Sequence, residues 1–317
     1  MNEQALSLLA QNLKECGCTD TPSEVLRRCE LLNIRVLPLS DPAYPPLLRE
    51  IYDAPRVLYC LGDTELLSGS MTAVVGSRKV TEYGRQAALC IGERLARGGR
   101  TVVSGMAKGT DSFAHEGALA GGGPTVAVLG CGADICYPSE NRLLREKIIK
   151  NGLLLTEYPP GTPPLQYHFP KRNRIISGLS REVIVVEAGI KSGSLITAEQ
   201  ALDQGREVYC VPGSIFTESN QGAHRLLQEG ASLLASFREL DGLCLLKTAS
   251  EAMAVEAPEE VRWLVGCLSD FGTHPEEAAA LTGRSPSEVQ TAAVLAQTAG
   301  AVRIGTDGKL YPVHQIS

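Results

Sequence analysis

Short apolar runs that end at glycine recur through the middle of the chain and constrain its fold most. The first run, at 73–75, breaks at Gly76, and helically spaced apolar residues follow over 87–95. A strand, a glycine turn and a helix form the first half of a βαβ unit. Most of the runs lack alternation, as in strands buried on both faces of a parallel sheet. The expected strands lie at 57–62, 73–75, 101–104, 125–129, 153–156, 183–186, 207–211 and 232–234.

Glycine turns after several of these runs predict a ligand-binding rim. Ligands bind outside the carboxyl ends of the strands in an open α/β sheet, and helix N-termini there favour anions. Gly76, Ser77 and Arg78 form the first turn, and the Arg78 guanidinium suits phosphate oxygens. A second turn places Gly105 and Lys108 on the same rim. We therefore expect a phosphate-bearing ligand at this edge of the sheet.

A third turn contains Ser192, Gly193 and Ser194 and opens a helix. Its backbone N–H and hydroxyl groups can donate to a phosphate. In the second turn, Asp111 stands where it can cap the helix that follows, and we expect that role for it.

A local basic run stands out against the net charge of −6. Residues 158–181 hold four Lys/Arg and no acidic residue. An aromatic ring beside cations is typical of single-strand binding, since the ring stacks on a base while the cations meet phosphates. A core position for the aromatic ring and a solvated helix start for the arginines are the alternatives. The residues at the centre of the run are Phe169, Lys171, Arg172, Asn173 and Arg174.

Several familiar sites are missing from the sequence. It has no Walker A motif, and the glycine runs at Gly76 and Gly130 are incomplete dinucleotide fingerprints. No combination of nucleophile, base and orienting residue is evident. The ten cysteines are scattered without a CxxC pair, so we expect no metal and no cofactor. No apolar run approaches the ~20 residues that span a bilayer, and the start of the chain lacks the basic region of a signal peptide.

The flanking segments differ in character from the middle of the chain. We expect a small helical domain over 1–38, with a capping box at Thr21, then an α/β domain over 39–240 and a linker over 241–257. Residues 258–317 read as three helices and a hairpin with Asp307 and Gly308 at its tip, which is typical of a winged helix. This last unit holds four Lys/Arg against seven Asp/Glu. That balance favours a protein partner or an intramolecular contact over duplex DNA.

Taken together, the motifs between residues 41 and 236 resemble the DprA family of DNA-processing proteins, also called Smf. Many separate motifs occur in the order found in that family. Besides the three turns above, they include Ala114-His115, Gly130-Cys-Gly-Ala-Asp134, Tyr137-Pro138, Glu157-Tyr-Pro-Pro-Gly161, Phe169-Pro-Lys-Arg-Asn-Arg174 and Val211-Pro-Gly213.

The resemblance implies a fold and a function. The fold would be an extended Rossmann-like domain, a mostly parallel sheet with helices on both faces. A small N-terminal helical (SAM-like) domain and a C-terminal winged helix would flank it. The protein would be a cytoplasmic, non-enzymatic homodimer, joined through the Rossmann domain. It would bind single-stranded DNA and load a RecA-type recombinase on it during natural transformation. Matching positions assign DNA binding to Arg78, Lys108, Phe169, Arg172 and Arg174.

An enzyme acting on a nucleotide or a nucleotide-sugar is the alternative function. Related glycine-rich folds cleave nucleoside monophosphates, and the segment from Ser192 to Glu199 loosely matches their phosphate loop. The run from Phe169 to Arg174 separates the two interpretations, because a small-nucleotide pocket does not need it.

Overall fold

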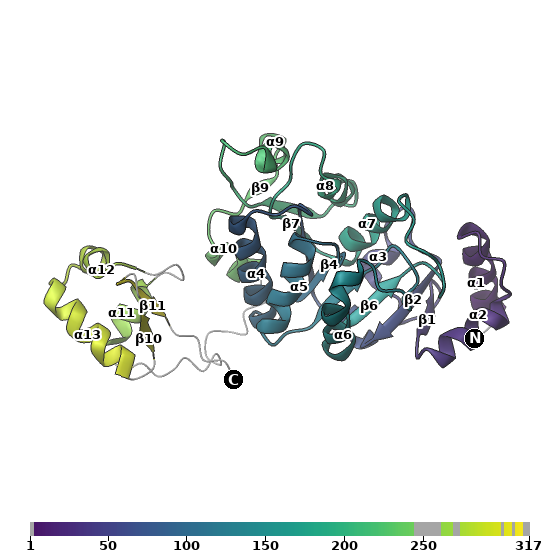
Figure 1. Cartoon of the computed structure of the whole chain (residues 1–317), viewed down its shortest axis with the longest axis horizontal. Coiled ribbons are helices and arrows are strands. Elements are labelled where there is room, and N and C mark those ends of the chain that lie inside the picture. Colours follow the sequence, from purple (N-terminus) through teal and green to yellow (C-terminus); the bar gives the residue numbers. More distant parts are fainter. Residues whose placement is uncertain (1–2, 244–260, 269–272, 299–300, 306–307, 313–317) are drawn as a thin grey trace. The chain divides into compact units, whose positions relative to one another are not determined.

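The chain divides into two compact units, Met1–Leu246 and Lys247–Ser317, in a computed structural model (Figure 1). The residues that the structure describes are 3–243, 261–268, 273–298, 301–305 and 308–312. Each unit is considered by itself below.

A nine-stranded sheet forms the centre of the larger unit, in the order β1-β2-β6-β5-β4-β3-β7-β8-β9. β1 pairs with β2 and β2 with β6 in antiparallel fashion, and every other pair is parallel. The strands are β1 Arg35–Pro38, β2 Val57–Gly62, β3 Met71–Val75, β4 Thr101–Ser104, β5 Thr125–Val128, β6 Leu153–Thr156, β7 Glu182–Val185, β8 Glu207–Cys210 and β9 Ser232–Leu233.

Helices cover both faces of this sheet (Figure 1). One face packs against α3, α7, α8 and α9 around residues such as Val75, Ile175 and Ala198. The opposite face packs against α4, α5 and α10 around Val74 and Ile91, and against α6 next to them. The helices are α1 Glu3–Glu15, α2 Pro22–Leu31, α3 Pro46–Arg49, α4 Glu82–Arg97, α5 Thr110–Ala120, α6 Arg142–Asn151, α7 His168–Leu179, α8 Gly193–Asp203, α9 Gln221–Gln228 and α10 Arg238–Leu243.

The sheet confirms the mostly parallel α/β fold, and the eight strands expected from the sequence are all present. The ninth, β1, was not expected: residues 35–38, the end of the helical domain expected over 1–38, form this strand. Pro38 is tolerated there because β1 is an edge strand. α1 and α2 pack on β2 through Leu9 and Val25, so the N-terminal helices share an apolar cluster with the sheet.

The described residues of the smaller unit form three helices followed by an antiparallel pair of strands. Its core includes Leu264, Val289 and Leu310. A capping box opens the third helix, since Ser285 N donates to Glu288 Oε2 at 2.8 Å and Glu288 N donates to Ser285 Oγ at 3.4 Å. Asp307, and most of the linker expected over 241–257, lie outside the described residues. The elements are α11 Arg262–Cys267, α12 Pro275–Thr282, α13 Pro286–Thr298, β10 Val302–Ile304 and β11 Leu310–Pro312.

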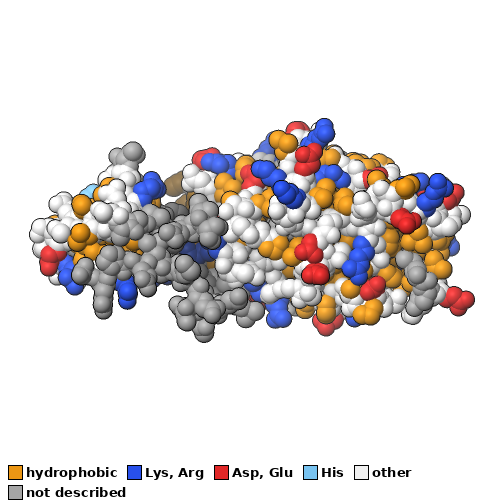
Figure 2. Space-filling view, turned by 90° about the horizontal axis from the view of Figure 1, so that it is seen from below, with side chains coloured by type: hydrophobic (Ala, Val, Ile, Leu, Met, Phe, Trp, Pro, Cys, Tyr) orange, Lys and Arg blue, Asp and Glu red, His pale blue; other side chains and the backbone are white. Residues whose placement is uncertain are grey.

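Charges of both signs are interspersed on the face of the larger unit shown in Figure 2. Among the described residues, no helix has the length and apolar character needed to cross a membrane. Within the same residues, no group of three or more His, Cys, Asp or Glu side chains is placed to hold a metal ion.

Candidate nucleic-acid interface

A hollow of about 710 Å³ lies at the carboxyl ends of β3 and β7. The chain runs from β3 through β4, β5 and β6 on one side of the sheet, and then crosses to β7 and β8 on the other side of β3. This is a topological switch point, where the loops after two neighbouring strands diverge and leave a crevice between them. Three walls surround the hollow: the loop after β3, the start of α8 and the start of α7.

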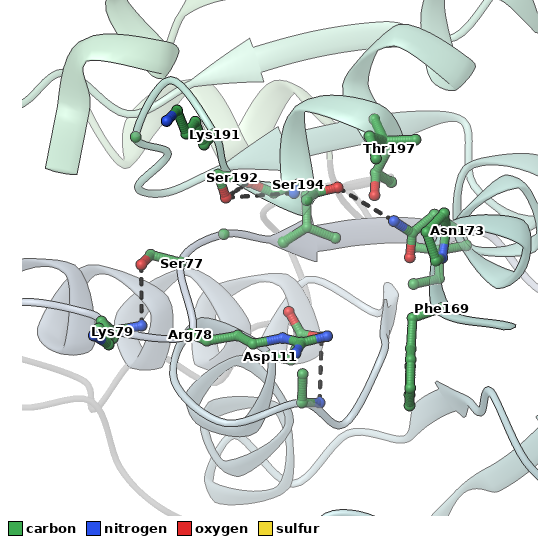
Figure 3. Close-up of a pocket in the computed structure, with 18 of the residues that line it drawn as sticks. Ser77, Arg78, Lys79, Asp111, Phe169, Asn173, Lys191, Ser192, Ser194 and Thr197 are labelled. Carbon is green, nitrogen blue, oxygen red and sulfur yellow. Dashed lines mark hydrogen bonds between the residues drawn. The ribbon is translucent and has the colours of Figure 1, made fainter. Parts of the chain in front are cut away.

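The loop after β3 carries Ser77, Arg78 and Lys79 along the first wall. Ser77 Oγ accepts from Lys79 N at 3.0 Å, and the Ser77 carbonyl accepts from Thr110 N at 3.1 Å. These bonds fix the backbone, while the Arg78 side chain stays exposed and extends across the hollow (Figure 3). The buried Glu187 carboxylate accepts from the N–H and hydroxyl groups of the residue that caps α4, and so ties this wall to β7.

The N-terminus of α8 forms the second wall. Ser192 is the N-cap, and its Oγ accepts from Ser194 N at 3.4 Å and lies 2.7 Å from Ser194 Oγ. Asn173 Nδ2 donates to the Gly193 carbonyl at 3.3 Å and joins α7 to this turn. Lys191 precedes the turn and is exposed (Figure 3). Hydroxyls, helical N–H groups and a lysine together make this wall favourable for an anion.

The third wall presents aromatic rings. Phe169, in the first turn of α7, is half-buried, and its ring centroid lies 5.3 Å from that of the more exposed Tyr137. The Arg78 guanidinium carbon lies 5.6 Å from the Phe169 centroid, within cation–π range. A Cβ at Gly130 would lie 2.9 Å from Phe169 Cδ1, so the absence of a side chain at residue 130 leaves room for the ring. The hollow therefore sets a π-face beside a cation.

Arg172 and Arg174 lie differently from what the sequence suggested, because both side chains are buried. Arg172 Nη1 donates to the Gly105 carbonyl at 2.8 Å and also to the Val128 carbonyl. Burial lowers the pKa of Arg172, and nearby Asp111 raises it. Arg174 donates to both carboxylate oxygens of Glu157, at 2.9 and 2.8 Å. Their guanidinium groups are thus bound by the protein, and they anchor α7.

Asp111 does not cap α5. The N-cap position is Gly109 and has no side-chain cap bond, while Asp111 lies within the first helical turn. Its carboxylate instead accepts from the N–H groups of Gly105 and Ala107, at 3.2 and 3.3 Å, and closes the preceding loop. Burial raises the pKa of Asp111, and the Arg172 charge lowers it. The pair therefore stabilises the floor of the hollow.

The hollow brings together most of the residues that the sequence singled out. Gly105, Lys108, Lys171 and Arg174 do not line it. Lys108 is exposed and pairs with Glu140, and Lys171 Nζ lies 3.5 Å from Glu157 Oε2. The predicted residues that do line it are Gly76, Ser77, Arg78, Phe169, Arg172, Asn173, Ser192, Gly193 and Ser194.

Tyr137, Lys79 and Lys191 also line the hollow, although the sequence assigned no ligand-binding role to them. Lys79 and Lys191 adjoin the turns at Arg78 and Ser192, and Tyr137 belongs to the Tyr137-Pro138 motif, so these motifs carry the signal that could have found them. Two carboxylates are present as well, the buried Asp111 and the exposed Glu218. Exposed cations exceed exposed carboxylates at the opening, against the negative net charge of the chain.

A mostly parallel α/β fold with an anion-favouring, aromatic-bearing hollow at its switch point defines a class of proteins that hold phosphate-bearing ligands. The family model described as DNA recombination-mediator protein A matches residues 35–241. The chain belongs to this family, which confirms the resemblance seen in its motifs.

Relatives and solved structures agree with this assignment. The DNA processing protein DprA of Streptococcus pneumoniae is 47% identical over 203 residues, 63% of this chain and 71% of the relative. The Bacillus subtilis protein of the same name is 45% identical over 208 residues, 65% of this chain and 70% of the relative.

Two solved structures share the fold. The X-ray structure of Streptococcus pneumoniae DprA has a TM-score of 0.64 and 37% identity, and the match covers 75% of this chain and 92% of that one. The Helicobacter pylori protein, whose structure concerns its single-stranded DNA binding mode, has a TM-score of 0.61 and 32% identity over 66% of this chain and 95% of that one.

Proposed function

We propose that this protein binds single-stranded DNA along the rim of its sheet and acts as a recombination mediator. The observation that carries the proposal is the half-buried Phe169 ring beside the exposed Arg78, in a hollow that also contains the α8 N-terminus. A base can stack on the ring while the next phosphate meets the cation and the helical N–H groups. The single-strand binding of the Helicobacter pylori relative supports the same ligand class.

In this proposal the three walls of the hollow contact different parts of the DNA strand. Phosphates would meet Arg78, Lys79 and Lys191, together with the N–H and hydroxyl groups of the turn at Ser192. A base would stack on Phe169, with Asn173 bracing α7 against α8. Gly76, Ser77, Gly193 and Ser194 would offer backbone or hydroxyl donors. Lys108 and Lys171, exposed outside the hollow, would attract the strand electrostatically, and Arg172 and Arg174 would hold α7 in place.

We propose a RecA-type recombinase as the protein partner, which this protein loads on the bound strand in the cytoplasm. The family description, that of a DNA recombination mediator, supports this proposal. We also propose a homodimer through the Rossmann-like unit, so that two rims hold one strand and avidity exceeds the affinity of either rim. Sedimentation at micromolar concentration tests the dimer. A purely monomeric protein would remove it.

A salt titration of oligonucleotide binding tests the central proposal. We expect the protein to prefer a single-stranded oligonucleotide to the matched duplex at physiological salt. The affinity should fall steeply as salt rises, because each neutralised phosphate releases counterions. Equal affinity for both forms would contradict the proposal. As a check on the alternative hydrolase, the protein is mixed with nucleoside monophosphates, and released base would favour an enzyme.

A further inference from the structure

A tight turn beside the hollow presents two large apolar side chains to solvent. Ile215 and Phe216 are 78% and 92% exposed, in the loop that follows β8. They occupy the two central positions of a turn in which Thr217 N donates to the Ser214 carbonyl at 3.4 Å. Such positions are usually taken by Gly, Pro, Asn, Asp or Ser, for reasons of backbone geometry. Neither Ile nor Phe serves the turn, and neither adds to the core.

The turn is held in a defined conformation by its neighbours. Phe216 N donates to Ser214 Oγ at 3.2 Å, and Thr217 Oγ1 donates to the Ser214 carbonyl at 3.0 Å. Asn220 Nδ2 donates to Thr217 Oγ1 at 3.1 Å. At the start of the loop, the Tyr83 hydroxyl donates to the Pro212 carbonyl at 2.7 Å. Because the backbone of this turn is already ordered, binding of a ligand to Ile215 and Phe216 would cost little conformational entropy.

The turn is continuous with the rim of the hollow. The residues that follow it, Glu218 and Ser219, line the hollow themselves. A Cβ at Gly189 would lie 3.3 Å from the Glu218 carbonyl oxygen, so the loops after β7 and β8 touch. Because β8 is the next strand beyond β7, the turn extends the rim in the direction away from Phe169.

We propose that Phe216, with Ile215 beside it, is a second stacking platform, which binds bases of the strand after it leaves the hollow. Lys191, on the neighbouring loop, would meet a phosphate between the two platforms. Bases are the occupant that fits, since a flat π-face needs no charge partner, and the Glu218 carboxylate here disfavours a run of phosphates. The inference rests on the proposed function and lengthens its site.

Oligonucleotide length separates this platform from the hollow. Binding of oligothymidylates of about 4 and about 16 nucleotides, the range of single-strand site sizes per module, is measured for the wild type and for Phe216→Ala. We expect roughly fivefold or greater weakening for the longer strand only, since the shorter one fills the hollow alone. Phe216→Trp should restore binding. Leu202→Ala is the matched control, an exposed apolar side chain in the last turn of α8, and should change neither affinity.

Fluorescence supplies a direct readout of contact. Trp263 is the single tryptophan of the chain, so Phe216→Trp combined with Trp263→Phe places the only indole in the turn. Stacking should quench this indole when the long strand binds, and an unquenched indole would overturn the proposal. Equal affinities of the wild type and Phe216→Ala for both strands would also overturn the second platform, but would leave the proposed function intact. A wild type that binds neither strand would remove both proposals. A loss of self-association in Phe216→Ala would show that the turn contacts a second copy of the chain, and would overturn the stacking proposal.

Discussion

Arg172 explains why residue 105 is a glycine. Arg172 Nη1 donates to the Gly105 carbonyl at 2.8 Å, and a Cβ on Gly105 would lie 2.2 Å from that same nitrogen. The guanidinium group is buried under the loop after β4, and it also donates to the end of β5. The buried Arg172 charge therefore holds the start of α7 against the sheet, and the absence of a Cβ at Gly105 leaves room for it.

We expect Gly105→Ala to lower the free energy of unfolding by about 1–3 kcal/mol, because overpacking forces the guanidinium out of its place. Gly193→Ala, in the first turn of α8, is the matched control, because a Cβ there lies within 4 Å of no atom in the described part of the chain. Urea denaturation of both variants measures the difference. Equal free energies of unfolding for the two variants would mean that the loop after β4 adjusts without cost and that the contact with Arg172 does not require a glycine.

Arg78 and Arg174 should fail in different ways. Arg78→Ala should leave the melting temperature unchanged, and should weaken DNA binding with a salt slope reduced by about one. Arg174→Ala breaks a buried bidentate pair with Glu157 and should cost about 3–5 kcal/mol of stability. Paired melting and binding curves on the two variants separate the roles. A stable Arg174→Ala variant that binds DNA poorly would show that Arg174 contacts DNA instead of stabilising the fold.

Phe169→Ala should weaken single-strand binding by ~1–3 kcal/mol with the salt slope intact, because stacking releases no counterions. Phe169→Tyr keeps a π-face and should bind nearly as well as the wild type. The ring is half-buried against Gly130, so the melting temperature is measured alongside. A collapse of folding without selective loss of binding would make Phe169 a core residue.

His115 should make the protein acid-sensitive. Its Nδ1 lies 2.7 Å from Thr125 Oγ1, which itself donates to the Val102 carbonyl, so Nδ1 carries the proton. Nε2 is buried and has no hydrogen-bond partner among the described residues, and burial lowers the pKa of His115 to about 3.

The pH window follows from that shift. The unfolded chain takes up a proton near pH ~6.5 and the folded protein does not, so the stability is complete above ~6.5. It should fall as the pH decreases toward about 3, by up to ~1.4 kcal/mol per pH unit. His115→Asn replaces the ring N–H donor with an amide N–H that does not titrate, and it should flatten this dependence in denaturation curves from pH 7 to 4. An unchanged pH slope in that variant would show that other groups cause the acid sensitivity.

The strands buried on both faces were the most predictable part of the fold. β2, β4 and β6 have the bounds expected from the sequence, because each is an apolar run between turn residues. β1 escaped prediction, since a four-residue edge strand that ends in Pro38 has the composition of a loop. Its identity depends on pairing with β2, which no local pattern contains.

The candidate site was predictable as a set of turns and less so as side-chain roles. Gly76, Ser192 and Phe169 converge as expected, because the carboxyl ends of parallel strands share one edge. The composition of the basic run predicts cations that face phosphate or solvent. Successive residues of a helix point in different directions, however, and the side chains of Arg172 and Arg174 on α7 are buried. Tyr137 belongs to a motif of the sequence, but the contact of its ring with Phe169 depends on the packing of distant loops, which one sequence does not reveal.

The switch point also sets the order in which the strands of the sheet can pair while the chain is being synthesised. β3 has β4 on one side and β7 on the other, and Glu182 of β7 follows its neighbour Thr72 by 110 residues. On the ribosome, where folding proceeds from the N-terminus, β3 can pair with β4 long before β7 emerges. Its outer edge is then an apolar strand with open hydrogen-bonding groups, which invites association between nascent chains. The strand that completes the binding hollow is therefore also the one that ends this period of exposure.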